Sequence, residues 1–140
     1  MTLELQATPE EVMRAVEVLQ EFGREKHVGE RELFGLALAL EECGSNIVNH
    51  ALHRDSRQKF QVRIEHTGSV MTIELRDHGP EFDPTRVPVG EPQAGDDDRP
   101  PGGWGIQLVR HYIDDMTYCR ETGENVLRLT KRLVPAASQE

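Results

Sequence analysis

The 140-residue sequence has little of several features that define common protein classes. It has only two cysteines and no CxxC spacing, which excludes a disulfide framework and a zinc knuckle. The longest apolar run, Leu33 to Leu40, has 8 residues, far short of the roughly 20 that span a bilayer. No basic segment followed by an apolar core opens the chain, so we expect a cytoplasmic protein with no membrane partner.

Basic side chains are also scarce, because 16 Lys and Arg stand against 25 Asp and Glu and the formal net charge is −9. A surface of that sign repels a polyanion, so we expect no nucleic-acid partner. The rest of the composition, 36% hydrophobic and 29% charged, is that of an ordinary globular protein. We expect one domain over residues 1–134, followed by a frayed tail over 135–140.

The hydrophobic period predicts helices in the first third of the chain. A short strand over residues 2–7 leads into a helix that Thr8 caps, with Pro9 at its first position and Glu11 completing a capping box. A longer helix is predicted from Glu30 to Ala51. Its apolar side chains recur at helical spacing: Leu33, Leu36, Ala37, Leu40, Cys43 and Ile47.

The period then changes to two, which indicates strands. Residues 60–64 and 71–75 alternate around a Thr-Gly-Ser turn and predict a β-hairpin. Residues 86–101 are rich in proline and aspartate and indicate a mobile loop. A helix from Trp104 to Asp114 and two strands, 116–120 and 125–132, follow. The fold class is therefore an α/β two-layer sandwich, with helices on one face of a mainly antiparallel mixed sheet.

Glu42, Asn46 and His50 form the first group of candidate site residues. Their i, i+4, i+8 spacing places them along one stripe of the long helix. An Asn oxygen can complete the ligand shell of a Mg²⁺ held by phosphates, and a Glu one turn away can accept a proton from an attacking hydroxyl. The same pattern is typical of the solvated face of an amphipathic helix, so it does not decide alone.

Asp77 and Gly79 follow the hairpin and form the second group. Asp77 continues the inward alternation of the strand, so its buried carboxylate needs a donor, such as an adenine amino group. Gly79 lets the backbone approach a flat ligand closely. A Gly-Pro turn that simply ends a strand is the alternative.

The third group is Gly102-Gly103-Trp104-Gly105, which opens a helix directly after the loop. Glycines at such a place let backbone N–H groups point at phosphate oxygens. A flexible hinge explains the glycines as well.

The order of the three groups resembles the N, G1 and G2 boxes of the GHKL ATPase and kinase superfamily. Within it the chain looks most like the anti-sigma-factor serine kinases of the RsbW and SpoIIAB type, over about Leu33 to Leu133. The resemblance implies a Bergerat-type ATP-binding fold. The segments that carry it are residues 39–42, 46–51, 79–84, 102–110 and 114–131.

The resemblance implies a role for each matching residue. Glu42 matches the catalytic carboxylate, Asn46 the Mg²⁺ ligand and Asp77 the adenine-binding aspartate. Thr130 matches a strand threonine that assists at the adenine. The remaining candidates for contacts with the nucleotide are Gly79, Phe82, Arg99, Gly103, Trp104, Gly105 and Ile106.

The implied function is an ATP- and Mg²⁺-dependent serine/threonine protein kinase. Its expected partners are a STAS-domain anti-sigma antagonist, a sigma factor and a second copy of the chain. One departure stands out: in the lid, about residues 86–103, Arg99 is the only basic residue between Arg86 and Arg110. A nucleotide-gated binding module with little or no phosphoryl transfer is therefore the alternative.

Overall fold

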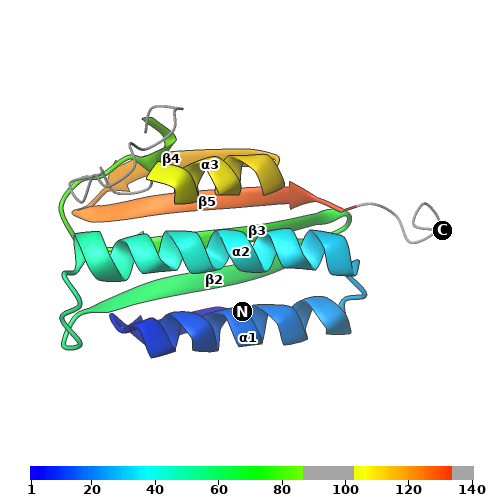
Figure 1. Ribbon diagram of the computed structural model, residues 1–140, viewed down its shortest axis with the longest axis horizontal. Helices are drawn as coiled ribbons and strands as arrows, with labels where there is room; N and C mark the ends of the chain where they lie inside the picture. The colour runs from blue at the N-terminus through cyan, green and yellow to red at the C-terminus, as the bar shows by residue number, and fades with distance from the viewer. Residues whose placement is uncertain (87–102, 134–140) are drawn as a thin grey trace.

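The structure is a computed structural model that describes residues 1–86 and 103–133, with the backbone alone for Gly103 and Trp104. Most of the expected lid, including Arg99, and the expected frayed tail lie outside the described residues. Three helices cover one face of a five-stranded sheet (Figure 1). The two-layer α/β sandwich predicted from the sequence is confirmed. No helix in the described ranges is long and apolar enough to cross a membrane.

The sheet has the strand order β1-β2-β3-β5-β4. Its strands are β1 (Thr2–Gln6), β2 (Lys59–Thr67), β3 (Val70–Asp77), β4 (Asp115–Glu121) and β5 (Glu124–Arg132). The four pairings of the described strands are all antiparallel, where a mixed sheet was expected. The register between β3 and β5 determines which residues meet at the end of the sheet, because it places Asp77 opposite Asn125.

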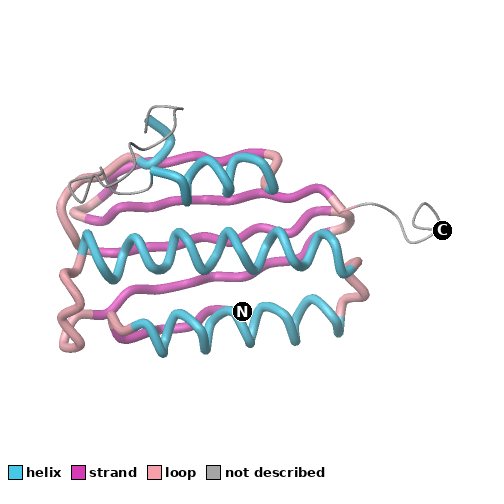
Figure 2. The backbone as a smooth tube through the Cα atoms, viewed as in Figure 1, coloured by secondary structure: helices cyan, strands magenta, loops and turns pink. Residues whose placement is uncertain are grey.

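The helical layer consists of α1 (Pro9–Glu25), α2 (Glu30–Asn46) and α3 (Gly103–Tyr112), and Figure 2 shows them lying across the strands. The predicted cap of α1 is confirmed, since the Glu11 N–H donates to Thr8 Oγ1 at 3.2 Å. The Glu11 carboxylate, however, accepts from the backbone N–H of Gln6 at 3.3 Å. The capping box therefore closes two residues further out than its standard form.

The core lies between the helices and the sheet. The inward residues of the hairpin, from Phe60 to Leu75, are buried, and so are the six apolar residues expected on the α2 face. Gly44 allows α1 and α2 to pack closely, because a methyl group there would lie 3.1 Å from Cγ1 of Val12. This close approach fixes the position of the α2 C-terminal half, which carries the first group of site residues.

The long helix expected from Glu30 to Ala51 changes its form at Asn46. Residues Ile47–Ala51 form a π-helix, η1, in which the N–H of Leu52 donates to the carbonyl of Ile47 at 2.8 Å. A π turn widens the helix by about one residue and recurs at functional sites. Apolar spacing alone cannot reveal that change, because Ile47 and Val48 remain buried through it.

Candidate functional site

A cavity of about 180 Å³ opens at the end of the sandwich where α2 ends, β3 ends and α3 begins. Its lining residues come from the first two predicted groups and the loop after β3, from Ile106 of α3 just after the third group, and from β4 and β5. They are Cys43, Asn46, Ile47, His50, Ala51, Asp77, Pro80, Phe82, Pro84, Ile106, Tyr118, Asn125 and Leu127. The predicted residues Asn46, Asp77, Phe82 and Ile106 thus meet in one place. The lining is mostly apolar, which suits a flat organic ring.

Asp77 is the buried carboxylate of the cavity, with 4% of its surface exposed. Its Oδ1 accepts hydrogen bonds from the N–H of Gly79 at 2.8 Å and from Nδ2 of Asn125 at 3.0 Å. Among the described residues no hydrogen bond reaches Oδ2. The second oxygen is therefore available to a donor that enters the cavity.

The position of Gly79 has no room for a side chain. A methyl group on it would lie 2.8 Å from Cβ of Ala51 and 2.9 Å from both Oδ1 of Asp77 and the carbonyl oxygen of Ala51. The last contact is with backbone, which cannot rotate away as a side chain can. The strand end that carries Asp77 therefore packs directly against η1, and only glycine fits between them.

Asn125, at the start of β5, ties the loop after β3 to the sheet. Its Nδ2 donates to Asp77 and to the carbonyl of Pro80 at 2.9 Å. Its Oδ1 accepts from the backbone N–H of Phe82 at 3.3 Å and from the Tyr118 hydroxyl at 2.5 Å. The nitrogen and the oxygen of the buried Asn125 amide thus both have hydrogen-bond partners. These bonds hold the wall of the cavity in one arrangement.

Arg120 strengthens the same wall from β4. Its Nη1 donates to the carbonyl of Gly79 at 2.7 Å and to Oδ1 of Asn125 at 3.1 Å. Burial is the largest influence on the nearby Tyr118 hydroxyl, and it raises the pKa of that group. Tyr118 therefore remains a neutral donor at physiological pH.

Asn46 lines the opposite side of the cavity, at the last residue of α2. Its Nδ2 is buried and has no hydrogen-bond partner among the described residues. An unsatisfied buried amide costs about 1–3 kcal/mol. Such an amide needs a ligand or ordered water to complete it, and this is the one buried side-chain nitrogen or oxygen of the described residues in that condition.

Glu42 lies one helical turn before Asn46 and touches the first turn of α3. A methyl group on Gly105 would overlap Oε2 of Glu42, so the absence of a Cβ there makes room for the carboxylate. Burial, followed by the negative charge of Glu41, raises the pKa of Glu42. Glu42 is not among the residues that line the cavity, but it lies between Gly105 and the helical turn that carries Asn46, and a carboxyl group with a raised pKa there suits an acid–base role.

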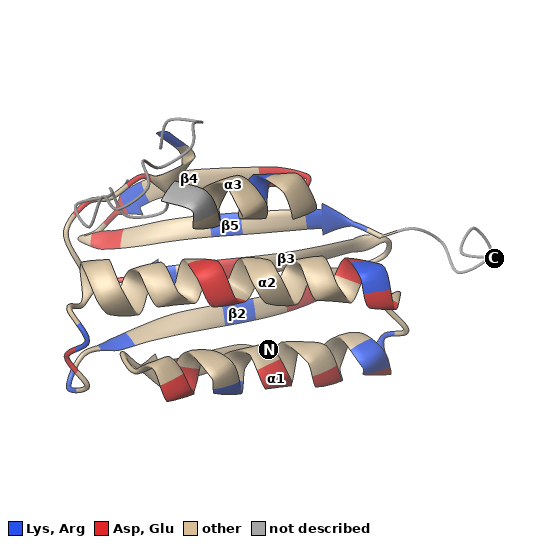
Figure 3. Cartoon of the chain, viewed as in Figure 1, with Lys and Arg blue, Asp and Glu red and all other residues tan. Residues whose placement is uncertain are grey.

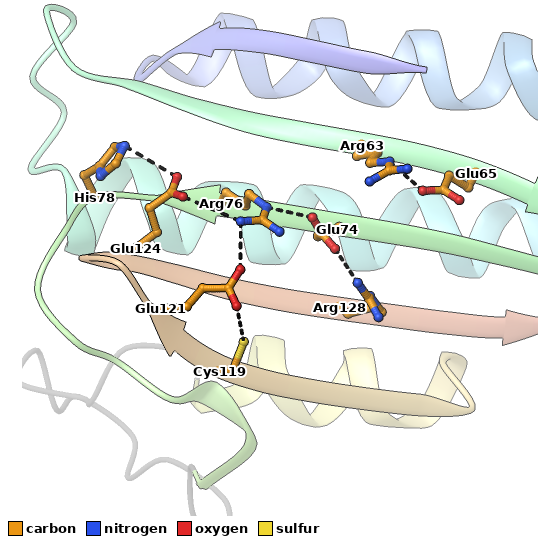
Figure 4. Close-up of polar contacts among 9 residues, drawn as sticks. All are labelled: Arg63, Glu65, Glu74, Arg76, His78, Cys119, Glu121, Glu124 and Arg128. Atoms are coloured by element: carbon orange, nitrogen blue, oxygen red, sulfur yellow. Dashed lines mark hydrogen bonds and ion pairs between the residues drawn. The ribbon is translucent and has the colours of Figure 1, made fainter.

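The open face of the sheet carries an ion-pair network near the end of β3 (Figure 4). Nε of Arg76 lies 2.7 Å from Glu74, and Nη1 of Arg76 lies 3.1 Å from Glu121 and 3.6 Å from Glu124. Burial tends to raise the pKa of Glu74, but hydrogen bonds from Arg128 and Arg76 lower it on balance. The network joins β3, β4 and β5 next to the cavity wall.

Thr130 does not belong to the site, and the prediction for it is wrong. It pairs with Thr72, five residues before Asp77 along β3, which is a separation of about 16 Å at the usual strand rise. Side chains alternate along a strand, so Thr130 also points to the face opposite the buried Leu129. Arg99 and the side chain of Trp104 lie outside the described residues, and Gly103 is described only as the first residue of α3.

Asn125, Tyr118 and Arg120 are the site residues that the sequence did not reveal. A signal for Asn125 existed, because it shares the inward alternation of Leu127 and Leu129 in β5. A polar residue at an inward position has the same need for a partner that identified Asp77. No local pattern identifies Tyr118 or Arg120, since their role depends on which strands pair.

Comparisons with known proteins agree with this geometry. The family described as "Histidine kinase-like ATPase domain" matches residues 5–131. The curated protein "Serine/threonine-protein kinase BtrW" of Bordetella bronchiseptica is 31% identical over 135 residues, which are 96% of this chain and 94% of that protein. The similarity therefore covers both chains almost from end to end.

A solved structure shows the same fold. The crystal structure of the RsbU and RsbW domains of a Mycobacterium tuberculosis protein matches with a TM-score of 0.68 and 18% identity. The match covers 95% of this chain and 31% of that chain, so this chain corresponds to under a third of that protein. It confirms the Bergerat-type fold. The chain therefore belongs to the family of histidine kinase-like ATPase domains, which bind ATP, and within it is similar to serine kinases of the anti-sigma-factor type.

Proposed function

We propose that this chain is an ATP- and Mg²⁺-dependent protein-serine kinase that phosphorylates a STAS-type anti-sigma antagonist and otherwise holds a sigma factor. One observation carries the proposal: the buried Asp77 carboxylate faces a preformed cavity, and Asn46 and Glu42 follow one another on the helix that forms its other wall. We call Asp77, Gly79 and Asn125 the base end of the site, and Glu42, Asn46 and Gly105 its transfer end.

At the base end, Oδ2 of Asp77 would accept a hydrogen bond from the amino group of adenine. The carboxylate is already oriented by Gly79 and Asn125, so little conformational freedom is lost when the base binds. Apolar side chains such as Ile106 and Phe82 would contact the ring faces. A base without an amino group at that position would leave the buried carboxylate without its donor, which gives selectivity for adenine.

At the transfer end, Asn46 fits a Mg²⁺ ligand. Among the described residues no hydrogen bond to its Nδ2 fixes the orientation of the amide, and an amide oxygen is a hard donor that Mg²⁺ accepts. The metal supplies charge stabilisation to the phosphates. The first turn of α3, where Gly105 lies, presents backbone N–H groups that favour anionic oxygens.

Glu42 would accept the proton during transfer. The serine Oγ of the substrate protein attacks the γ-phosphorus of ATP, an Oγ–P bond forms, and the bond from that phosphorus to the bridging oxygen of ADP breaks. The hydroxyl proton passes to the Glu42 carboxylate. The raised pKa of Glu42 makes it a better proton acceptor than an exposed glutamate.

The test measures transfer of radiolabelled γ-phosphate from ATP with Mg²⁺ to each STAS-domain protein encoded in the genome that carries this chain. We expect phosphoserine on at least one of them, and a loss of about 10²–10⁴-fold in rate for Glu42→Ala, the usual contribution of a general base. Calorimetry should show that this variant still binds ATP. Glu30→Ala, at the exposed far end of the same helix, is the matched control and should keep its transfer activity. Undiminished transfer in Glu42→Ala would contradict the assigned mechanism.

The alternative function is a nucleotide-gated binding module with little turnover. It is favoured by the absence of Lys and Arg from the described lining of the cavity, since a cationic contact to the γ-phosphate normally assists transfer. Tight ATP binding without phosphorylation of any STAS protein, together with ATP-dependent binding of one of them, would support this alternative. Absence of ATP binding would contradict both functions.

A further inference from the structure

Two large apolar side chains on the helical layer are exposed to a degree that the fold does not require. Phe34 on α2 is 59% exposed and Leu108 on α3 is 40% exposed. Both belong to helices whose other apolar residues are mostly buried in the core. An exposed cluster of large apolar side chains commonly marks an interaction surface.

These residues lie on two neighbouring helices that run in opposite directions (Figure 1). Gly105 at the start of α3 lies against Glu42, and Tyr112 at its end lies against Gly35, where an added methyl would be 3.0 Å from Cβ of Tyr112. The two contacts fix the alignment of the helices. Leu108, between them on α3, is therefore level with Leu38, between them on α2.

The aligned side chains form three levels. Phe34 and Tyr112 meet edge to face, with ring centroids 5.8 Å apart, at the level furthest from the site. Leu38 and Leu108 occupy the middle level, and Glu42 with Gly105 the last. Eight residues separate Phe34 from Glu42, a distance of about 12 Å along α2. An apolar surface thus leads directly to the carboxylate that would accept the proton.

We propose that this surface, the α2–α3 ridge of Phe34, Leu38, Leu108 and Tyr112, is where the phosphoacceptor protein docks. The inference rests on the proposed function. A serine hydroxyl offers too little contact to select a protein, so a protein kinase must hold its substrate at a second place near the transferred phosphate. The ridge is continuous with the transfer end and lies within the reach of one folded partner.

The ridge suits an apolar patch on that partner. Aromatic and large aliphatic anchors contribute most of the energy of protein interfaces. In Figure 3 the ribbon of α2 between its acidic midpoint and its charged N-terminal turn has no charged residue, and most of the coloured ribbon of α3 is also uncharged. The partner therefore presents apolar side chains beside its acceptor serine, with charges confined to the rim.

The test uses Phe34→Gln, Leu108→Gln and the double variant, because glutamine keeps helix propensity while removing the apolar contact. Met13→Gln is the matched control, since Met13 is an exposed apolar residue on α1, at 43%, away from the ridge. Transfer is measured as kcat and KM for the STAS-domain protein that the wild type phosphorylates. ATP affinity, melting temperature and sedimentation are measured for every variant.

We expect the double variant to raise KM for the protein substrate about tenfold or more, the effect of losing interface anchors. Its ATP affinity and its kcat should stay within about twofold, and Met13→Gln should match the wild type. An unchanged KM would overturn the ridge while leaving the kinase intact. A dimer that dissociates in the variants, with KM unchanged, would show that the ridge binds a second copy and would also overturn it. Absence of transfer by the wild type to every STAS protein would instead overturn the proposed function.

Discussion

At the base end of the site, Asp77 and Asn125 bond to each other, to the backbone of residues 79–82 and to Tyr118 and Arg120. At the transfer end, Asn46 keeps a buried nitrogen without a partner in the described chain, and Glu42 has a raised pKa. The base end is thus held by hydrogen bonds within the protein, with Oδ2 of Asp77 left open, whereas the buried Nδ2 of Asn46 at the transfer end has no partner among the described residues. The difference agrees with the proposed roles, because the residues that would bind the base are fixed in place and the unsatisfied group lies where transfer would occur.

Among the variants that test this difference between the two ends, Asp77→Asn should have the largest effect, on ATP affinity. We expect ATP affinity to fall about 10–100-fold, because a hydrogen bond to a charged acceptor contributes about 1.5–3 kcal/mol. Calorimetry with ATP measures it. Asp83→Asn is the control, since the Asp83 carboxylate caps the Thr85 backbone at 2.9 Å and does not line the cavity. Equal affinities for the two variants would show that the base does not bind at Asp77.

Gly105→Ala should affect the transfer end alone. The added methyl overlaps the Glu42 carboxylate, so either the side chain or the first turn of α3 must move. We expect the rate of transfer to fall about tenfold or more, because small displacements of a reacting group are costly. The change in ATP affinity should be smaller than the change in rate. A variant that loses affinity but keeps its rate would remove the distinction between the two ends.

Asn125→Ala and Thr130→Ala compare the residue found in the structure with the residue expected from the sequence. Loss of Asn125 leaves the buried Asp77 short of a donor, so we expect unfolding free energy to fall by about 1–3 kcal/mol. Thr130→Ala should change it by about 0.5 kcal/mol or less. Urea unfolding and ATP calorimetry measure both variants. Weaker ATP binding in Thr130→Ala alone would restore the original assignment.

Glu42→Gln should have the opposite sign, because we expect it to stabilise the fold at pH 7 by about 0.5–2 kcal/mol, the usual gain from one favourable substitution. The folded-state pKa of Glu42 is raised, so ionisation weakens the folded state once the pH exceeds the unfolded-state pKa. The stability gain should therefore shrink as the pH falls and disappear well below about pH 4, the unfolded-state pKa of glutamate, where Glu42 is protonated in both states. A pH-independent gain would mean that packing, rather than charge, is the cause.

The sequence was sufficient for most of the fold because local patterns determine it. Thr8 and Pro9 start α1, the alternation of residues 60–75 builds the hairpin, and Asp77 is buried where its inward position predicted. Spacing also placed Asn46 on the cavity side of its helix. These features need only neighbouring residues, whose period carries the information.

The predictions were wrong or incomplete where a residue's position depends on segments that are distant in the sequence. The register of β3 with β5 sets Asn125 opposite Asp77 and moves Thr130 away, and no single segment contains that register. The contact between Glu42 and Gly105 likewise depends on two helices that are far apart in the sequence, since α2 ends at Asn46 and α3 begins at Gly103. The residue pattern of a segment predicts which face of a helix or strand is buried, but it does not predict which other segment packs against that face.

The π turn after Asn46 has a consequence for how the chain tolerates length changes. An α-helix rotates by about 100° with each residue. Deleting one residue from η1 would return the segment to α-helical winding and turn Ala51 away from Gly79, while Glu42 and Asn46 stayed in place. The extra residue therefore sets the rotation of Ala51 relative to Asn46, and we expect single-residue deletions to be accepted in the exposed stretch 56–58 but not within η1.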